Sequence, residues 1–170
     1  MRKACLLILF ILGLPLLTYG QSPSSTTIST SANAVIVKPI DITVASDIHF
    51  GSIAAGAIEG TITLGVDGTI TYSGGTFPVD AGDESINASF EISGEPYGSV
   101  SFTLPLEIIL TDPASGQELI MTDFLLDKGT NPSLDKDGKL TVSMGATLHI
   151  GAHQEAGSYT SSFELMVSYE

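Results

Sequence analysis

Histidines are the first residues of this sequence whose chemistry deserves testing, because they could bind a metal ion. His149 and His153 stand four residues apart, and His49 is isolated beside Phe50. Zinc sites are built from His, Cys and acidic side chains at characteristic spacings, and these histidines have no acidic partner at such a spacing. The pair also falls on a predicted strand and turn rather than on one face of a helix. We therefore expect no metal site.

Two acidic segments could bind calcium, the run from Asp135 to Gly138 and the pair Asp67–Gly68. An EF-hand loop that starts at Asp135 needs an oxygen ligand at its fifth position and a glutamate at its twelfth. Lys139 and Ala146 occupy those positions, and neither side chain can bind calcium. Both segments are therefore predicted to be turns.

Signatures of catalysis are missing from the sequence. There is no Gly-x-Ser-x-Gly elbow to support a serine hydrolase. A glycosidase needs two carboxylates at a defined separation, and nothing in the sequence places two of them so. We expect a protein that is not an enzyme and that uses no cofactor.

The first twenty residues are predicted to be a secretory signal peptide. Arg2 and Lys3 precede an apolar run over residues 4–17, and Gly20 is a small residue before a cleavage point at Gln21. The run is shorter than the roughly 20 residues of a membrane span, so we expect no membrane insertion after the signal is removed. The single cysteine, Cys5, leaves with the signal, which excludes a disulfide in the mature chain.

The mature chain is strongly acidic. The whole sequence has six lysines and arginines and nineteen acidic residues. Two of the basic residues lie in the predicted signal peptide. The mature chain therefore has four basic and nineteen acidic residues, which gives a net charge of −15. A surface of this charge repels phosphate backbones and anionic lipids, which argues against nucleic acid as a partner and against binding to membrane surfaces.

Three regions follow from the patterning: the signal peptide (1–20), an extension (21–34) and a folded domain (35–170). The extension is rich in Ser and Thr, which is typical of a flexible tail, although small apolar residues alternate along it from Ile28. Through the folded domain, short alternating stretches are separated by Gly, Pro and Asp about every 8–12 residues. Asp67–Gly68 is the strongest hairpin signal. We predict an all-β, immunoglobulin-like sandwich of roughly eight or nine strands.

The end of the chain is predicted to be the strand around which the domain is organised. Its odd positions are largely apolar and its even positions largely polar, which gives one apolar face. That face consists of Tyr159, Phe163, Leu165, Val167 and Tyr169. Burying Phe163, Leu165 and Val167 would stabilise the fold by roughly 1.5–3 kcal/mol each, so the strand must dock on the core. Whether its second neighbour comes from this chain or from another molecule stays open.

This end resembles the subunits of chaperone–usher pili. Those subunits close with a strand that has a penultimate tyrosine, as Tyr169 is here, and a glycine fourteenth from the end, as Gly157 is here. A broader resemblance, over residues 34–170, is to an uncharacterised family of secreted bacterial β-sandwich domains. Its motifs stand at residues 39–42 (Pro-Ile-Asp-Ile), 50–51 (Phe-Gly), 145–148 (Gly-Ala-Thr-Leu) and 156–159 (Ala-Gly-Ser-Tyr). Many pilus subunits carry a disulfide, and this chain departs from that pattern.

The resemblance implies an exported, non-enzymatic subunit of the cell surface or of a pilus that works by strand pairing. Its partners would be other copies or related subunits, with a periplasmic chaperone before assembly. Its interface would comprise Gly157, Tyr159, Phe163, Leu165, Val167 and Tyr169, and its sandwich would be incomplete. It would reside in the periplasm, at the cell surface or outside the cell. The alternative is a self-complete secreted sandwich that binds a glycan or a surface protein.

Overall fold

A computed structural model describes residues 25–79 and 82–170. The predicted signal peptide and the first four residues of the extension lie outside the described residues. The chain divides into two units, residues up to Val35 and Ile36–Glu170, and each is described by itself. In the first unit, residues 25–35 form no strand and their side chains are exposed.

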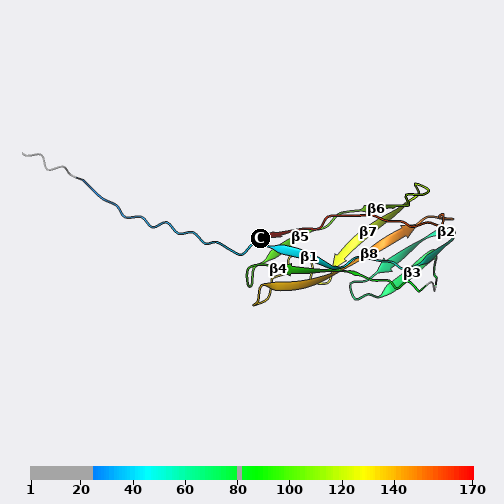
Figure 1. Cartoon of the computed structure of the whole chain (residues 1–170), viewed down its shortest axis with the longest axis horizontal. Coiled ribbons are helices and arrows are strands. Elements are labelled where there is room, and N and C mark those ends of the chain that lie inside the picture. Colours follow the sequence, from blue (N-terminus) through cyan, green and yellow to red (C-terminus); the bar gives the residue numbers. More distant parts are fainter. Residues whose placement is uncertain (1–24, 80–81) are drawn as a thin grey trace, which may run out of the picture. The chain divides into compact units, whose positions relative to one another are not determined.

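The second unit is built from strands, and no helix occurs in the part of the chain that the structure describes (Figure 1). Seven strands form one antiparallel sheet, and β5 pairs with β9 in a second. The strands are β1 (Asp41–Ser46), β2 (Ile53–Leu64), β3 (Ile70–Pro78), β4 (Ala88–Ser93), β5 (Val100–Thr103), β6 (Ile108–Thr111), β7 (Glu118–Leu126), β8 (Lys139–Ile150) and β9 (Met166–Tyr169). The prediction of an all-β, sandwich-like fold with eight or nine strands is confirmed.

β8 is the central strand of the larger sheet. Its first half pairs with β4 over residues 139–144, and its second half pairs with β2 over residues 146–150. β7 pairs with the opposite side of β8. Alternate residues of β8, such as Val142, Met144 and Leu148, are fully buried, as the strand period of two requires. β8 therefore links the β1–β4 part of the sheet to the β2–β3 part.

The core consists of two clusters of buried side chains that meet along β8. The first contains Phe50, Ile62, Leu64, Ile108, Leu119, Met121, Ala146, Leu148 and Ile150. The second contains Ala88, Phe90, Ile92, Val100, Phe102, Leu126, Leu134, Val142 and Met144. Phe163 packs against both clusters, so the end of the chain reaches across the whole length of the core.

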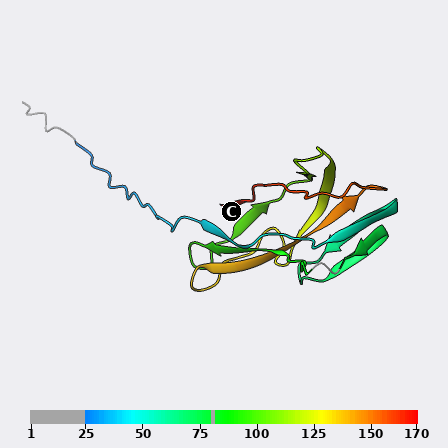
Figure 2. The ribbon, with the colours of Figure 1, turned by 45° about the vertical axis from the view of Figure 1, so that its right-hand side comes forward.

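The hairpin between β2 and β3 confirms the turn predicted at Asp67–Gly68. The Asp67 carboxylate accepts hydrogen bonds from the Thr69 amide (3.0 Å) and the Thr69 hydroxyl (2.6 Å), and Gly68 has φ +80°. The hairpin extends further than the sequence suggests, because Gly74 and Gly75 do not end β3 (Figure 2). β2 bulges at residues 56–59, and the Ile58 carbonyl lies where a side chain at Gly75 would stand.

The first strand starts later than the alternation in the sequence suggests. Regular pairing begins at Asp41, whereas Val35 and Val37 are exposed and belong to no strand. Pro39 has no backbone N–H for a strand ladder. The amide of Lys38 is also unavailable to a strand, because it donates to the Glu95 carboxylate (2.9 Å). The apolar alternation at Val35 and Val37 therefore does not mark a strand that packs on the core.

Candidate strand-binding groove

The final fourteen residues, 157–170, form what we call the terminal segment, and its backbone pairs on one side. Met166–Tyr169 pair with Val100–Thr103 in β5. Further back, Thr160 and Thr111 exchange both backbone hydrogen bonds, at 2.9 and 3.1 Å. Within residues 25–79 and 82–170, no strand pairs with the other side of the segment. The regular strand is therefore shorter than predicted, and it stands at an open edge.

The apolar face of the terminal segment points toward the core but stays only partly covered. Phe163, Leu165, Val167 and Tyr169 pack against the second core cluster, and each is half-buried. The intervening even-numbered residues are exposed. Phe163 contacts the ring of Phe124, with the ring centroids 6.2 Å apart and the planes tilted by 41°. The predicted alternation is therefore present, although its apolar side chains are not fully buried.

β1 has a second open edge. It pairs with β4, and within the described residues it has no other strand neighbour. Val44 is in register with Phe90, whose side chain is buried in the core. Paired residues on neighbouring strands point to the same face of a sheet, so Val44 also faces inward. Its side chain is nevertheless 59% exposed, as expected where a neighbouring strand is missing.

We call the open edge of β1 and the open edge of the terminal segment together the groove, each edge being one wall, and Tyr169 joins the two walls at one end. The Tyr169 hydroxyl accepts a hydrogen bond from the Glu95 amide (2.6 Å) and donates one to the Lys38 carbonyl (2.7 Å). The ring fits because Gly94 and Gly98 have no side chains, and a Cβ at either position would collide with it. This Tyr169 bridge ties the start of β1 to the end of the chain.

A cavity of about 640 Å³ lies between the segment that follows β1 and the start of the terminal segment. Its two sides come from residues 48–55, which follow β1, and from residues 154–159. Four core side chains form its apolar base, Leu110, Leu119, Leu148 and Ile150. Asp83 and Glu155 also line it. The cavity is large enough for several apolar side chains, and its base belongs to the first core cluster.

Gly157 occupies a position where a side chain would not fit. A Cβ there would lie 2.7 Å from one carboxylate oxygen of Asp112. That carboxylate is buried and accepts bonds from the Ser115 hydroxyl (2.6 Å), the Ser115 amide (3.1 Å) and the Ala114 amide (3.3 Å). These bonds, the Ser115 hydroxyl first, hold the pKa of Asp112 below its usual value. The turn after β6 thus packs closely against the start of the terminal segment.

All six residues predicted as interface residues belong to the terminal segment. Gly157 and Tyr159 line the cavity, whereas Phe163, Leu165, Val167 and Tyr169 continue along the groove. The Tyr159 hydroxyl donates to the Glu155 carbonyl (2.7 Å). Sequence reasoning missed the opposite wall, Ile42 and Val44. Their alternation was visible, but pairing of Val44 with a buried residue appears only once strand register is known.

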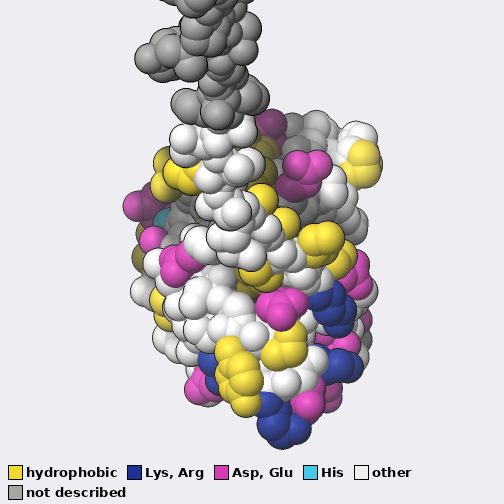
Figure 3. Space-filling view, turned by 90° about the vertical axis from the view of Figure 1, so that its left-hand side faces the viewer, with side chains coloured by type: hydrophobic (Ala, Val, Ile, Leu, Met, Phe, Trp, Pro, Cys, Tyr) yellow, Lys and Arg dark blue, Asp and Glu magenta, His cyan; other side chains and the backbone are white. Residues whose placement is uncertain are grey.

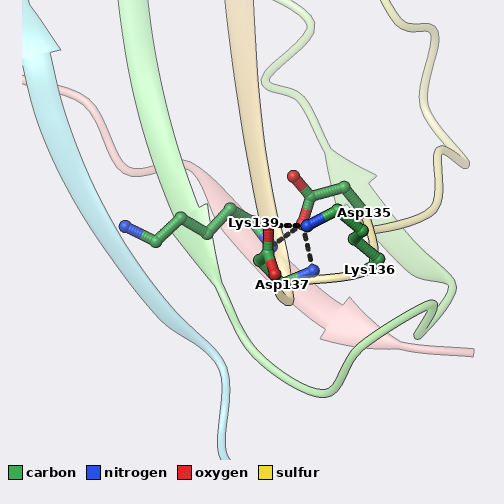
Figure 4. Close-up of polar contacts among 4 residues, drawn as sticks. All are labelled: Asp135, Lys136, Asp137 and Lys139. Carbon is green, nitrogen blue, oxygen red and sulfur yellow. Dashed lines mark hydrogen bonds and ion pairs between the residues drawn. The ribbon is translucent and has the colours of Figure 1, made fainter.

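Residues considered for metal or catalytic chemistry have local roles. His149 lies 2.8 Å from the Thr122 hydroxyl, and His49 lies 3.2 Å from the Glu84 carbonyl. Asp135 caps its turn, as Figure 4 shows, by accepting bonds from the Asp137 and Lys139 amides at 2.8 Å each. In the described ranges, no three His, Cys, Asp or Glu residues are grouped so that they could hold a metal ion. Those ranges also contain no helix able to span a membrane.

The fold and groove define a β-sandwich domain with an open edge, and a comparison of sequences identifies its family. Residues 40–169 match a domain of unknown function, DUF4402. The match covers most of the chain, so this protein belongs to the DUF4402 family. The membership of an uncharacterised domain family expected from the motifs is confirmed at this level. No curated protein and no solved structure matches the chain significantly.

Proposed function

We propose that this protein is an exported, non-enzymatic structural subunit of the cell surface, similar to a pilus subunit, that joins its partners by strand pairing. One observation carries the proposal: Val44 faces inward, pairs with buried Phe90 and is still 59% exposed. It belongs to the open edge of β1, and the backbone of the terminal segment likewise pairs on one side only within the described residues. Both walls therefore offer unpaired main-chain groups and uncovered apolar side chains to a visiting strand.

A strand added here gains from two interactions at once. Main-chain hydrogen bonds to an open sheet edge supply affinity, and pockets for alternate side chains set the register. In this groove the apolar contacts come from Val44 on one wall and from Phe163, Leu165 and Val167 on the other. The cavity accepts the larger side chains at the end near Gly157. The ligand is thus an extended segment with apolar side chains at alternate positions.

Other copies of this chain or related subunits are the partners that fit this ligand. Residues 21–37 carry no charged side chain, which suits insertion into a protein with nineteen acidic residues. Within this run Ile28, Val35 and Ile36 are almost fully exposed. A periplasmic chaperone would cover the groove before assembly, and the assembled protein would reside at the cell surface or outside the cell. The open edge favours this role over a self-complete sandwich that binds a glycan.

Titrating the mature protein with a synthetic peptide of residues 26–37 tests the proposal. We expect amide exchange to slow in residues 161–168 and the melting temperature to rise with peptide concentration, because the ligand binds the folded form. Replacing Val44 by lysine places a charge where the peptide must pack, and should weaken binding by at least about tenfold.

Thr43→Lys is the matched control. Thr43 is the neighbouring residue of β1, is exposed and points to the opposite face of the sheet. It should leave peptide affinity unchanged. The proposal is wrong if the peptide protects none of residues 161–168, or if the two lysine variants bind it equally well.

A further inference from the structure

The terminal segment is attached to the rest of the fold by few main-chain bonds. Its short strand β9 pairs with β5, and Thr160 pairs with Thr111. Residues 161–165 lie between these contacts and belong to no strand, and Figure 2 shows this part of the chain as a red coil. Side chains supply further contacts, since Phe163 packs against both core clusters. Detaching the segment therefore breaks fewer backbone bonds than detaching β8, which pairs with β2, β4 and β7.

The turn that connects β8 to the terminal segment, residues 151–156, holds its backbone in an unfavourable conformation. His153 has φ +53°, in the left-handed region that is sterically costly for a residue with a Cβ. The His153 amide donates to the Gly56 carbonyl (2.8 Å), and the Gln154 amide donates to the Gly151 carbonyl (3.3 Å). The closed turn therefore holds strain at His153 that an extended connection would release.

We infer that the terminal segment exchanges between two copies of this protein, and that release of the strained turn favours the exchange. Each copy would place residues 157–170 on the core of the other. Exchange of an identical element is a low-cost route to dimers, and a short connection under strain promotes it. This inference goes beyond the proposed function, because it concerns the last strand of the fold rather than the extension.

A second copy fits as the partner because the contacts of the segment are remade between copies. In the exchanged form, β9 of one copy pairs with Val100–Thr103 of the other, and Phe163 packs against both core clusters of that copy. The Tyr169 bridge forms in the same way between copies. The bonds that are lost lie within the turn, such as those of the His153 and Gln154 amides. Exchange therefore needs no complementary surface beyond the one already present in the monomer.

Charge sets the conditions under which we expect to see the exchange. Figure 3 faces the end of the second unit where the chain terminates, and it shows carboxylates beside lysines there. Copies of a chain with nineteen acidic residues repel one another, and salt screens this repulsion. Exchanged dimers should therefore form at high protein concentration and high ionic strength. They should separate slowly on dilution, because the segment must detach first.

Cysteine cross-linking tests the exchange, because the predicted mature chain has no cysteine of its own. Thr103 and Met166 are exposed partners in the β5–β9 ladder. One variant carries Thr103→Cys and another carries Met166→Cys, so neither contains both cysteines in one copy. The two variants are mixed at high concentration and high salt and then oxidised. We expect a disulfide that joins one variant to the other, because exchange brings the two cysteines into register.

Thr43→Cys, mixed with Met166→Cys, is the control for collisions between copies. Thr43 is exposed on β1 and does not pair with β9. The Thr103 pair should give at least about tenfold more cross-linked dimer than this control, because exchange holds its cysteines together. The inference is overturned if the two mixtures give equal yields, or if the natural chain stays monomeric at high concentration and high salt.

His153→Gly tests the role of the turn. Glycine adopts a positive φ without the steric cost, so the closed turn is favoured and the dimerisation constant should fall by at least about tenfold. Ala152→Gly is the matched control, since it adds the same flexibility at a neighbouring exposed residue whose φ is not positive. Sedimentation measures both constants, and equal dimerisation of the two glycine variants would overturn the inference.

Binding of the 26–37 peptide reports separately on the proposed function. Peptide binding to natural protein that gives no specific cross-link between the cysteine variants would overturn the exchange and leave the proposed function standing. Specific cross-linking in protein that does not bind the peptide would support the exchange and contradict the proposed function.

Discussion

At the scale of residues, Tyr169 and Gly157 lie near the two ends of the terminal segment, and each makes a close contact with another part of the chain. Tyr169 joins the start of β1 to the loop after β4 through one hydroxyl group. Gly157 allows the terminal segment to pass over the Asp112 carboxylate. In the sequence, Gly157 and the penultimate Tyr169 are marked only by their spacing from the end of the chain. The structure gives a different physical reason for each of these residue types.

Tyr169→Phe removes one hydroxyl group and leaves the ring in place. The Glu95 amide and the Lys38 carbonyl each lose a partner, so we expect a loss of about 1–2 kcal/mol in the free energy of unfolding. Urea denaturation measures this loss. Tyr97→Phe is the control, because the Tyr97 side chain is exposed. An equal effect of both substitutions would show that the bridge contributes nothing.

Gly157→Ala should destabilise the fold by about 1–3 kcal/mol, because the added methyl group overlaps the Asp112 carboxylate. A double-mutant cycle with Asp112→Ala isolates this overlap. Once the carboxylate is absent, the added effect of Gly157→Ala should fall below about 0.5 kcal/mol. If instead the two losses add, the contact with Asp112 is not the reason for glycine.

The pKa shifts of three aspartates predict how the free energy of unfolding changes as the pH falls. Hydrogen bonds lower the pKa of Asp112 (first from the Ser115 hydroxyl), Asp67 (from the Thr69 hydroxyl) and Asp135 (from the Lys139 amide). Because the folded pKa lies below the unfolded value near 3.8, these groups stabilise the fold above that pH. Their contribution disappears as pH falls through the folded pKa values.

Urea midpoints measured between pH 7 and pH 2 check this response. Asp135→Asn removes one of the three ionisations, so the variant should be less stable than the natural chain at pH 7 and should lose less stability on acidification. A variant whose pH profile runs parallel to that of the natural chain would argue against the assignment.

At the scale of elements, the sandwich is uneven in how firmly its strands are held. Within the part of the chain that the structure describes, β8 has strand neighbours on both sides, whereas the terminal segment and β1 each have one. Strands with exposed backbone groups open more readily than strands at the centre of a sheet. An unpaired edge is also an association hazard that proteins usually cover. The groove therefore combines a structural weakness with the surface that we propose binds a strand.

Amide hydrogen exchange tests that difference in the free mature protein. Residues 161–165, which belong to no strand, should exchange faster than residues 140–148 of β8. Slow exchange throughout residues 161–168 in monomeric protein would mean that a further strand pairs there, and that the edge is closed.

At the scale of the whole molecule, composition bears on how the fold is stabilised and on how copies of it meet. The predicted mature chain has no cysteine, so its stability rests on the two core clusters. Its negative charge keeps copies apart except where specific surfaces meet. On the proposed function, the chain must be released from its predicted signal peptide before the extension can act.

The mature protein should therefore begin at or near Gln21. The apolar run ends at Leu17 and small Gly20 precedes the cleavage point. Intact-mass analysis of exported protein checks this directly. Material that retains Met1 would contradict the prediction and would leave the extension attached to an apolar leader.

Local patterning was enough to predict the fold class and the apolar face of the terminal segment. Alternation of apolar residues reports which way a strand faces, and Asp67–Gly68 specifies a hairpin by its own chemistry. These are properties of neighbours in sequence, and burial of alternate residues from Phe163 to Tyr169 follows them. The late start of β1 and the continuation of β3 through Gly75 were missed, because each depends on a distant partner.

Only the tertiary structure decided that the sandwich has an open edge. An unpaired strand and a paired one have the same alternation in sequence, since pairing is a relation between segments far apart in the chain. Val44 illustrates this, because its exposure has meaning only when Phe90 is found beside it. The same holds for Tyr169, whose hydroxyl meets Lys38 across 131 residues. Sequence determined which side chains face the core, and three-dimensional pairing determined which edge lacks a neighbour.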